Sequence, residues 1–136
     1  MKITLDLGAF PPVRAHGTDA GLDIRSREEV TIHPGSRAII GTGTHVQLQP
    51  GTCGLLVSKS GLNLSWGLTS TGLIDEGYTG EIMVALDNHG TLPYTVRPGD
   101  KITQLVILPC RYEPVEIVDS IAGGERGDSG FGSTGR

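Results

Sequence analysis

The sequence lacks several features that mark common classes of protein. It has no apolar run long enough to cross a membrane, and its N-terminal stretch has no hydrophobic signal core. We therefore expect a soluble, cytoplasmic protein without a membrane partner. Lysine and arginine number 11 against 15 acidic residues, which gives a net charge of −4. Because binding to nucleic acid needs a surplus of positive charge, no nucleic-acid partner is expected.

Cysteine is scarce, and Cys53 and Cys110 lie far apart along the chain. They form no Cys-x-x-Cys pair, so we expect two reduced, partly buried thiols rather than a disulfide or a metal site. The four histidines are scattered, without the spacing of zinc ligands. No structural zinc site is expected.

A sustained helical period is also missing. Short alternating segments rich in β-branched residues recur instead, and turn formers such as Gln-Pro-Gly and Arg-Pro-Gly-Asp separate them. We expect strands at 29–32, 44–48, 81–86 and 101–107, and one helical turn near 60–64. Many short strands joined by turns predict an all-β sandwich or barrel of the jelly-roll kind.

Length and composition indicate one small domain. The chain has 136 residues, of which 37% are hydrophobic. Because a short chain buries a smaller fraction of its surface, association with further copies would help it. We expect a core over residues 1–121 and a flexible, glycine-rich arm over 122–136 as part of the same domain.

The arm has a pattern that suits a lid over a ligand. It contains six glycines, and its one large apolar side chain, Phe131, precedes Gly132, Ser133 and Thr134. Backbone N–H groups and the two hydroxyls could cradle a phosphate while the phenyl ring covers a flat ligand. The sequence is not a Walker A loop, because no Gly-Lys-Ser/Thr follows at the required spacing.

The stretch 72–81 places reactive side chains between glycines. Asp75 follows two apolar residues, and Tyr78 comes three positions later, with glycines at 72, 77 and 80. Glycine permits sharp turns and lets a ligand approach the backbone closely. A lone Asp in a turn would mean little, since Asp is a common turn former. Its meaning depends on the other motifs.

Five stretches stand out along the chain. They are Ala-Gly-Leu-Asp-Ile at 20–24, Ser-Lys-Ser-Gly-Leu at 58–62, the segment 72–81, Arg-Pro-Gly-Asp-Lys-Ile-Thr-Gln-Leu at 97–105, and the segment 126–135. In order and approximate spacing they resemble the five motifs of trimeric dUTPases, the dUTP pyrophosphatases, and the resemblance runs from about Asp19 to the C-terminus. It implies a distorted jelly-roll (β-clip) protomer, a homotrimer with active sites between subunits, and an exchanged C-terminal arm.

The resemblance also implies a reaction: Mg²⁺-dependent hydrolysis of dUTP to dUMP and pyrophosphate. Such an enzyme keeps uracil out of DNA and supplies dUMP for dTMP synthesis. Asp75 would orient and deprotonate the water that attacks the α-phosphorus. Asp23 would help to position Mg²⁺ through water, because this ion keeps several waters and takes further ligands from phosphates.

Substrate contacts follow from the same motifs. Tyr78 would lie against the deoxyribose and leave no space for a 2′-hydroxyl. The backbone of Leu73 and Ile74, together with Met83, would read uracil. Asp100, after Pro-Gly, is interpreted as a structural turn residue. The residues expected at the triphosphate or in the lid are Lys59, Ser60, Gly61, Gln104, Arg126, Phe131, Gly132, Ser133 and Thr134.

The chain differs from the family pattern in three places. Lys59 stands where the family usually has arginine, which removes a bidentate fork but keeps the charge. Thr-Ser-Thr-Gly at 69–72 replaces the Asn-x-Pro-Gly of many bacterial members, so no Asn side chain is available to read uracil. Ser129 stands at a usual glycine.

Two alternative functions are open at this point. A dCTP deaminase has the same fold and the fourth-motif Gln, but typically lacks the Asp-x-x-Tyr pair and the Phe-Gly-Ser-Thr-Gly tail. A dUTPase-like protein could instead sense the nucleotide and regulate a protein partner, with residues 60–72 as the natural place for partner-specific change. Nothing in the sequence requires such a partner.

Overall fold

The computed structural model describes residues 1–127, and its regular secondary structure consists of strands and one short helix. The all-β, jelly-roll class predicted from the sequence is confirmed. Among the described residues, no helix has the length and apolar character needed to cross a membrane. The elements, in order, are β1 (Lys2–Leu5), β2 (Gly21–Arg25), β3 (Val30–Ile32), β4 (Arg37–Gln47), β5 (Thr52–Val57), α1 (Ser60–Trp66), β6 (Leu68–Ile74), β7 (Glu81–Asn88), β8 (Tyr94–Val96) and β9 (Lys101–Pro109).

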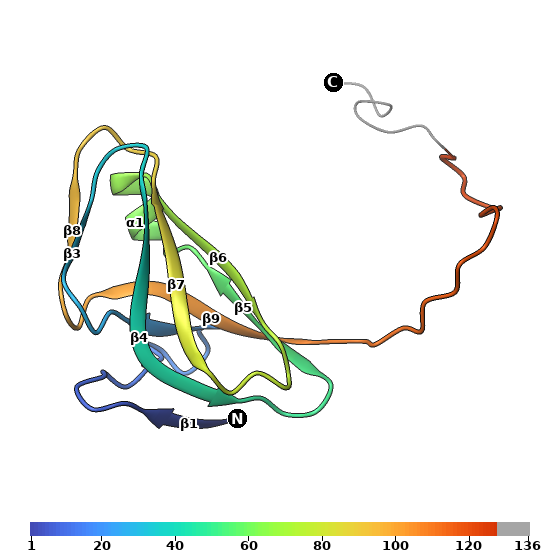
Figure 1. The fold of residues 1–136 in the computed structure, drawn as a ribbon, viewed down its shortest axis with the longest axis horizontal. Helices are drawn as coiled ribbons and strands as arrows, with labels where there is room; N and C mark the ends of the chain where they lie inside the picture. The colour runs from blue at the N-terminus through green and yellow to red at the C-terminus, as the bar shows by residue number, and fades with distance from the viewer. Residues whose placement is uncertain (128–136) are drawn as a thin grey trace.

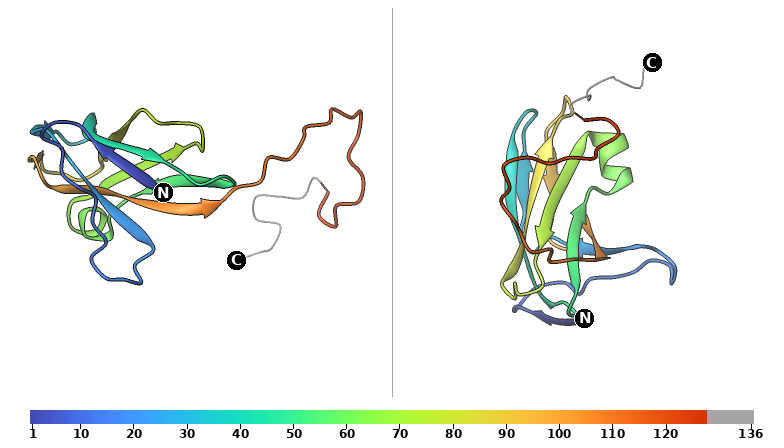
Figure 2. Two further views of the ribbon diagram at one scale, coloured as in Figure 1. Left: turned by 90° about the horizontal axis from the view of Figure 1, so that it is seen from below. Right: turned by 90° about the vertical axis from the view of Figure 1, so that its right-hand side faces the viewer.

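Seven of the strands form one antiparallel sheet in the order β1-β4-β7-β6-β5-β9-β2, and β3 pairs with β8. The large sheet curls, so that β9 crosses behind β4 and β7 (Figure 1). Figure 2 shows the same curled sheet from two further sides. In this order β9 lies between β2 and β5, although these three strands do not follow one another along the chain. This strand order puts the first motif, on β2, beside the fourth motif, on β9, and the second motif begins directly after β5.

The core lies inside the curled sheet and follows from the alternation of each strand. On β7, Ile82, Val84 and Leu86 are buried while Met83 between them is exposed. Alternate side chains of a strand point to opposite faces, so a two-residue period buries one face and presents the other. Ile102 and Leu105 of β9 extend the same core. Met83 is therefore left outside the core, on the face that carries the site.

Three predicted strands match closely, and β4 is longer than expected. It begins at Arg37 rather than Thr44, and its register with β7 shifts between Gly41 and His45. The bulge is held by side chains: Glu28 accepts from Gly41 N–H at 2.6 Å. A bulge breaks the two-residue period, which hides the first half of the strand from pattern reading.

Helix α1 is also longer than the single turn expected at 60–64, because it runs to Trp66. It ends where Gly67 adopts the left-handed conformation with φ 69° and donates to the carbonyl of Asn63 at 2.8 Å. A Cβ at Gly67 would lie 2.7 Å from the backbone N of Gly90. Glycine is therefore required both for the turn and for the close approach.

The chain leaves the core after β9. Residues 110–127 extend away from the sheet without a regular element (Figure 1). Val115, Ile117 and Ile121 of this segment are 90–95% exposed. The last strand ends at Pro109, twelve residues before the expected boundary at 121. The division into core and arm stays a prediction, because residues 128–136 lie outside the described chain.

Candidate active site

The turn between β6 and β7 holds Asp75 and Tyr78. The backbone N–H of Tyr78 donates to the carbonyl of Asp75 at 3.0 Å, and its hydroxyl donates to the carbonyl of Glu81 at 2.8 Å. A Cβ at Gly80 would lie 2.5–2.9 Å from atoms of the tyrosine ring. The ring therefore lies directly on Gly80. This close contact explains why residue 80 is a glycine, although its φ is not positive.

The hairpin opens into a cleft at this turn. Backbone pairing between β6 and β7 stops at Ser70 and Leu86, beyond which the two strands part. The resulting open cleft has a volume of about 220 Å³ and is lined by Leu73, Ile74, Asp75, Tyr78, Glu81 and Met83. Five of these residues were predicted from the sequence as catalytic or substrate-binding. We call Leu73, Ile74, Asp75, Tyr78 and Met83 the hairpin group.

Glu81 was not predicted, although it lines the same cleft. Its carboxylate accepts from Gly43 N–H at 2.7 Å and lies 3.4 Å from Arg27. These contacts tie the start of β7 to the bulge of β4. Its position at the end of the third motif could have indicated a role in the site. From the sequence, we expected Glu81 only as the first residue of a strand.

A second group of predicted residues lies on β2, on β9 and at the start of α1, which follows β5. Asp23 is opposite Gln104 in the β2–β9 ladder, and Gln104 is opposite Val57 in the β5–β9 ladder. A Cβ at Gly21 would lie 2.9 Å from the Cβ of Gln104, so the Gln104 side chain lies over this glycine. We call Asp23, Lys59, Ser60, Gly61 and Gln104 the sheet group.

Asp23 is buried, at 4% exposure, and two ammonium groups neutralise it. One is Lys59, which hydrogen-bonds Asp23 Oδ1, and the other is Lys101, 2.9 Å from Oδ2. Burial acts to raise the pKa of Asp23, but hydrogen bonds and charge from the two lysines outweigh it and leave the pKa lowered. The family resemblance assigned Lys59 to phosphate and Asp23 to Mg²⁺, but within the chain these two side chains bind each other. The sequence did not predict that Lys101 also pairs with Asp23.

This arrangement does not suit direct coordination of a metal by Asp23. Both carboxylate oxygens already have lysine partners. Across residues 1–127, no group of three or more His, Cys, Asp or Glu side chains could hold a metal ion. The predicted Mg²⁺ contact through Asp23 therefore stays a prediction.

The two groups lie at different levels along the sheet. Gly54 is opposite Ile74 in the β5–β6 ladder, whereas Val57, which is level with Gln104, is opposite Thr71. Asp75 is thus four residues further along, or about 13 Å at ~3.3 Å per residue, and two strands away. Figure 1 shows α1 near one end of β6 and the β6–β7 turn at the other.

Known proteins share this combination of fold and motifs. The family model for dUTPase matches residues 10–135. The chain belongs to the dUTPase family. It is 46% identical to a deoxyuridine 5′-triphosphate nucleotidohydrolase of Clostridium kluyveri, over 93% of this chain and 91% of that one. The corresponding protein of Clostridium acetobutylicum is 44% identical, over 96% and 92%.

Solved dUTPase structures have the same fold. The dUTPase of Staphylococcus bacteriophage 80alpha with dUpNHpp superposes with a TM-score of 0.91 at 32% identity, covering 99% of this chain and 98% of that one. A mutant dUTPase from phage phi11 of S. aureus, described with a structural Mg(II) ion, gives a TM-score of 0.80 at 31% identity and covers 88% and 96%.

The remaining predicted residues of this dUTPase lie in or beyond the extended segment. Arg126 lies at the end of that segment, within the described chain. Phe131, Gly132, Ser133 and Thr134 lie outside the described residues. Asp100 accepts from Arg97 N–H at 2.8 Å, which confirms its place in a turn.

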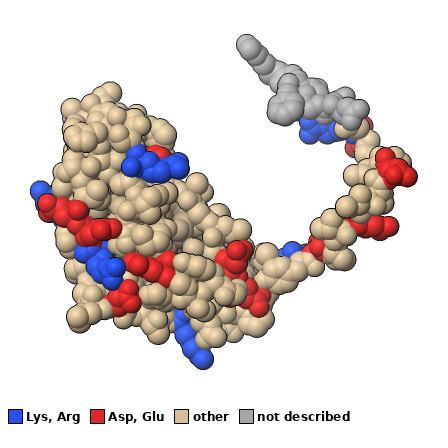
Figure 3. Space-filling model, viewed as in Figure 1, with Lys and Arg blue, Asp and Glu red and all other residues tan. Residues whose placement is uncertain are grey.

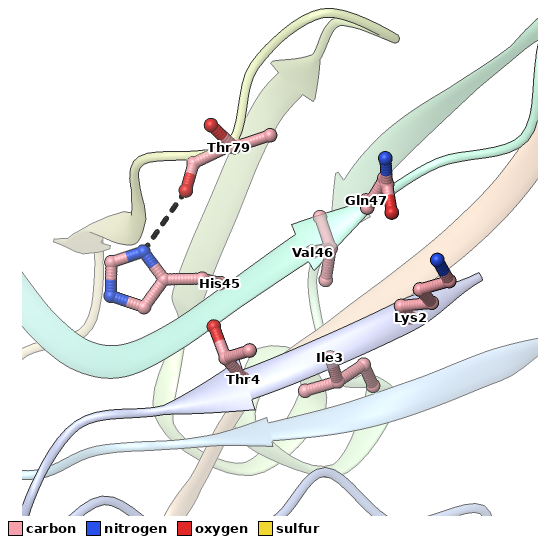
Figure 4. Close-up of a pocket in the computed structure, with 7 residues that line it drawn as sticks. All are labelled: Lys2, Ile3, Thr4, His45, Val46, Gln47 and Thr79. Carbon is pink, nitrogen blue, oxygen red and sulfur yellow. Dashed lines mark hydrogen bonds between the residues drawn. The ribbon is translucent and has the colours of Figure 1, made fainter.

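Another hollow lies along β1 and β4 and reaches Thr79 of the β6–β7 turn (Figure 4). It has a volume of about 230 Å³, and its lining includes Ile3, Val46 and His45, whose Nδ1 lies 3.0 Å from the carbonyl of Thr79. None of the predicted site residues lines it. The face in Figure 3 mixes acidic and basic side chains and carries no continuous basic surface.

Proposed function

We propose that this chain is a dUTP diphosphatase of the cytoplasm, which hydrolyses dUTP to dUMP and pyrophosphate. The observation that carries the proposal is the hairpin group: a dUTPase-family chain presents Asp75, Tyr78 and Met83 around one cleft. Such an activity would keep uracil out of DNA and provide dUMP for dTMP synthesis. Family membership favours it over dCTP deamination.

Asp75 acts as the general base in this proposal. It is exposed in the turn, where water can reach its carboxylate. The Asp75 carboxylate takes a proton from water, the oxygen attacks the α-phosphorus in line, and pyrophosphate leaves with the bridging oxygen. Positioning and charge stabilisation by the surrounding donors supply much of the remaining rate.

The cleft provides the selectivity. Because β6 and β7 part after Ser70 and Leu86, the β7-facing backbone of Leu73 and Ile74 has room to bind uracil. Hydrogen-bond mismatch discriminates strongly, so cytosine would be rejected. The ring of Tyr78, held by Gly80 and by the Glu81 carbonyl, would exclude a ribose 2′-hydroxyl.

A homotrimer with sites between subunits would join the two groups. One chain places Asp75 about 13 Å along the sheet from Gln104. The phosphate contacts expected from the sheet group would then come from a neighbouring copy, and the segment 110–127 would carry Arg126 across. Its exposed Val115, Ile117 and Ile121 favour burial against another chain.

The test of the reaction compares pyrophosphate release from dUTP, dCTP, dTTP and UTP, with Mg²⁺ and with a chelator. We expect release from dUTP alone, and only with Mg²⁺. Ammonia from dCTP would contradict the proposal and favour a deaminase. No product from any nucleotide would instead favour a nucleotide-sensing regulator. Control of virulence-gene transfer is described for the 80alpha phage dUTPase.

A subunit-mixing experiment tests the shared site. Asp75→Asn removes the base, and Gln104→Glu places a negative charge at the expected phosphate position. Each variant alone should be inactive, but denaturing and refolding them together should restore part of the activity. Some sites then combine the unchanged Asp75 of one variant with the unchanged Gln104 of the other. Sites built within one chain would give no recovery. Light scattering would report the mass of the assembly.

A further inference from the structure

The two cysteines that are distant in sequence meet at one end of the sheet. Cys53 on β5 is opposite Leu108 on β9. Two residues later, Cys110 N–H donates to the carbonyl of Gly51 at 2.8 Å, which continues the same ladder. Side chains two residues apart on a strand share a face. Cys53 and Cys110 are therefore diagonal neighbours on the outer face.

The cysteine pair adjoins the catalytic turn. Cys53 and Cys110 line one open cavity of about 410 Å³ together with Asp75, Glu76, Gly77 and Tyr112. Gly54 is opposite Ile74, so one step further along the ladder Asp75 is level with Cys53. Cys53 thus lies between Cys110 on one side and Asp75 on the other.

The surroundings of Cys110 reflect this proximity. Burial raises the pKa of the Cys110 thiol, and the neighbouring Cys53 thiol raises it further. Smaller contributions come from the charges of Asp75 and Glu76. Both cysteines are free and partly exposed, so small reagents can reach them. Reduced thiols were predicted from the sequence, but their proximity was not.

We propose that Cys53 and Cys110 form a redox site, in which an intrachain disulfide made by a low-molecular-weight disulfide slows dUTP turnover. The effect on turnover rests on the proposed function, whereas formation of the disulfide does not.

The chemistry needs no reagent beyond that oxidant. One cysteine thiolate attacks oxidised glutathione, forms a mixed disulfide and releases one glutathione thiolate. The second cysteine thiolate attacks the protein sulfur of the mixed disulfide and releases the other. Two protein thiols are oxidised, one glutathione disulfide is reduced to two thiols, and the protons pass to the leaving thiolates.

The bond would act on Asp75 through Tyr112 and Glu76. Diagonal neighbours lie about 7–8 Å apart, whereas a disulfide requires Cα atoms roughly 4.4–6.8 Å apart, so Cys110 moves towards Cys53. Two residues on, Tyr112 donates to Glu76 Oε2 at 2.6 Å. The same oxygen accepts from Gly51 N–H at 2.8 Å. Because Glu76 follows Asp75, a shift of this network moves the general base.

The first measurement detects the disulfide. The full chain is incubated with oxidised glutathione, and its intact mass, free thiols and tryptic peptides are compared with and without dithiothreitol. We expect loss of both thiols, a mass lower by two hydrogens and a Cys53–Cys110 cross-link within one chain. Cys110→Ser and Cys53→Ser should instead retain a glutathione adduct. Stable adducts on the wild type, or links between chains, would overturn the proposal.

The second measurement tests the consequence. Turnover of dUTP by the oxidised wild type should fall at least about tenfold, since small displacements of a catalytic group are costly. Dithiothreitol should restore it, and oxidised glutathione should leave a variant that carries both Cys53→Ser and Cys110→Ser at its own starting rate, because that variant can form neither the disulfide nor an adduct. A complete disulfide with unchanged turnover would refute the regulatory effect. If the reduced wild type fails to hydrolyse dUTP, the proposed function fails, while the mass measurement still decides the redox site.

Discussion

Two aspartates of the same fold have opposite surroundings. Asp23 lies in the middle of β2, buried and paired with Lys59 and Lys101. Asp75 lies in a turn, exposed, with Tyr78 N–H bound to its backbone carbonyl rather than to its carboxylate. A carboxylate neutralised by two lysines organises the sheet, while one that faces water can exchange a proton. The surroundings, and not the residue type, assign the roles.

The largest effect is expected for Asp75→Asn. Removal of a general base typically costs about 10²–10⁴-fold in rate. Pyrophosphate release should fall by that factor, while the midpoint of thermal unfolding stays close to that of the wild type because the side chain is exposed. Near-normal release would place the general base elsewhere.

Asp23→Asn should lower the free energy of unfolding, which Asp75→Asn leaves nearly unchanged. Breaking a buried ion pair costs about 3–5 kcal/mol, and here both Lys59 and Lys101 lose their carboxylate partner. Urea unfolding should show a loss of roughly 3 kcal/mol. Asp75→Asn is the matched control, since it makes the same chemical change at an exposed position. Equal stability of the two variants would contradict the comparison.

The same carboxylate predicts a pH dependence. The pKa of Asp23 is lowered in the folded chain, because its lysine partners outweigh the effect of burial. Its stabilising contribution is therefore fully present above the pKa of an unfolded aspartate and is lost as pH falls through the lowered pKa. Between these limits the wild type should lose stability on acidification faster than Asp23→Asn. Parallel curves would remove Asp23 as the cause.

A smaller effect is expected from Gly80→Ala, which tests how the turn holds its tyrosine. The new Cβ would collide with the ring of Tyr78, at 2.5–2.9 Å. Displacing the ring should reduce the kcat/KM preference for dUTP over UTP by about tenfold. Gly77→Ala is the control, because a Cβ there meets nothing within 4 Å. An unchanged preference in Gly80→Ala would mean that the ring does not exclude the ribose hydroxyl.

The smallest effect is expected for Glu76→Gln. The hydrogen bond from Tyr112 to Glu76 raises the pKa of the phenol to about 12, with burial as a lesser cause. Removing the negative charge should return the pKa of Tyr112 towards about 10. Alkaline absorbance titration measures the change, and Tyr112→Phe identifies the signal. A phenol that still titrates near its wild-type pH would exclude this contact.

Pattern reading found the parts of the fold in which strand alternation is regular. The segment at 81–86 lies within β7, where Ile82, Val84 and Leu86 repeat a two-residue period, and the segment at 101–107 lies within β9. The first half of β4 escaped notice because a bulge interrupts its period. Strands such as β1 and β2 escaped because they are short and their pattern gives little signal.

By itself, the sequence determined the motifs, the all-β class and the identity of the hairpin group, since those residues are neighbours along the chain. The pairing of Asp23 with Lys59 and Lys101, and the meeting of Cys53 with Cys110, were decided only by the tertiary structure. The physical reason is the crossover of β9 between β2 and β5. Strand order and register bring together residues that no spacing along the chain connects.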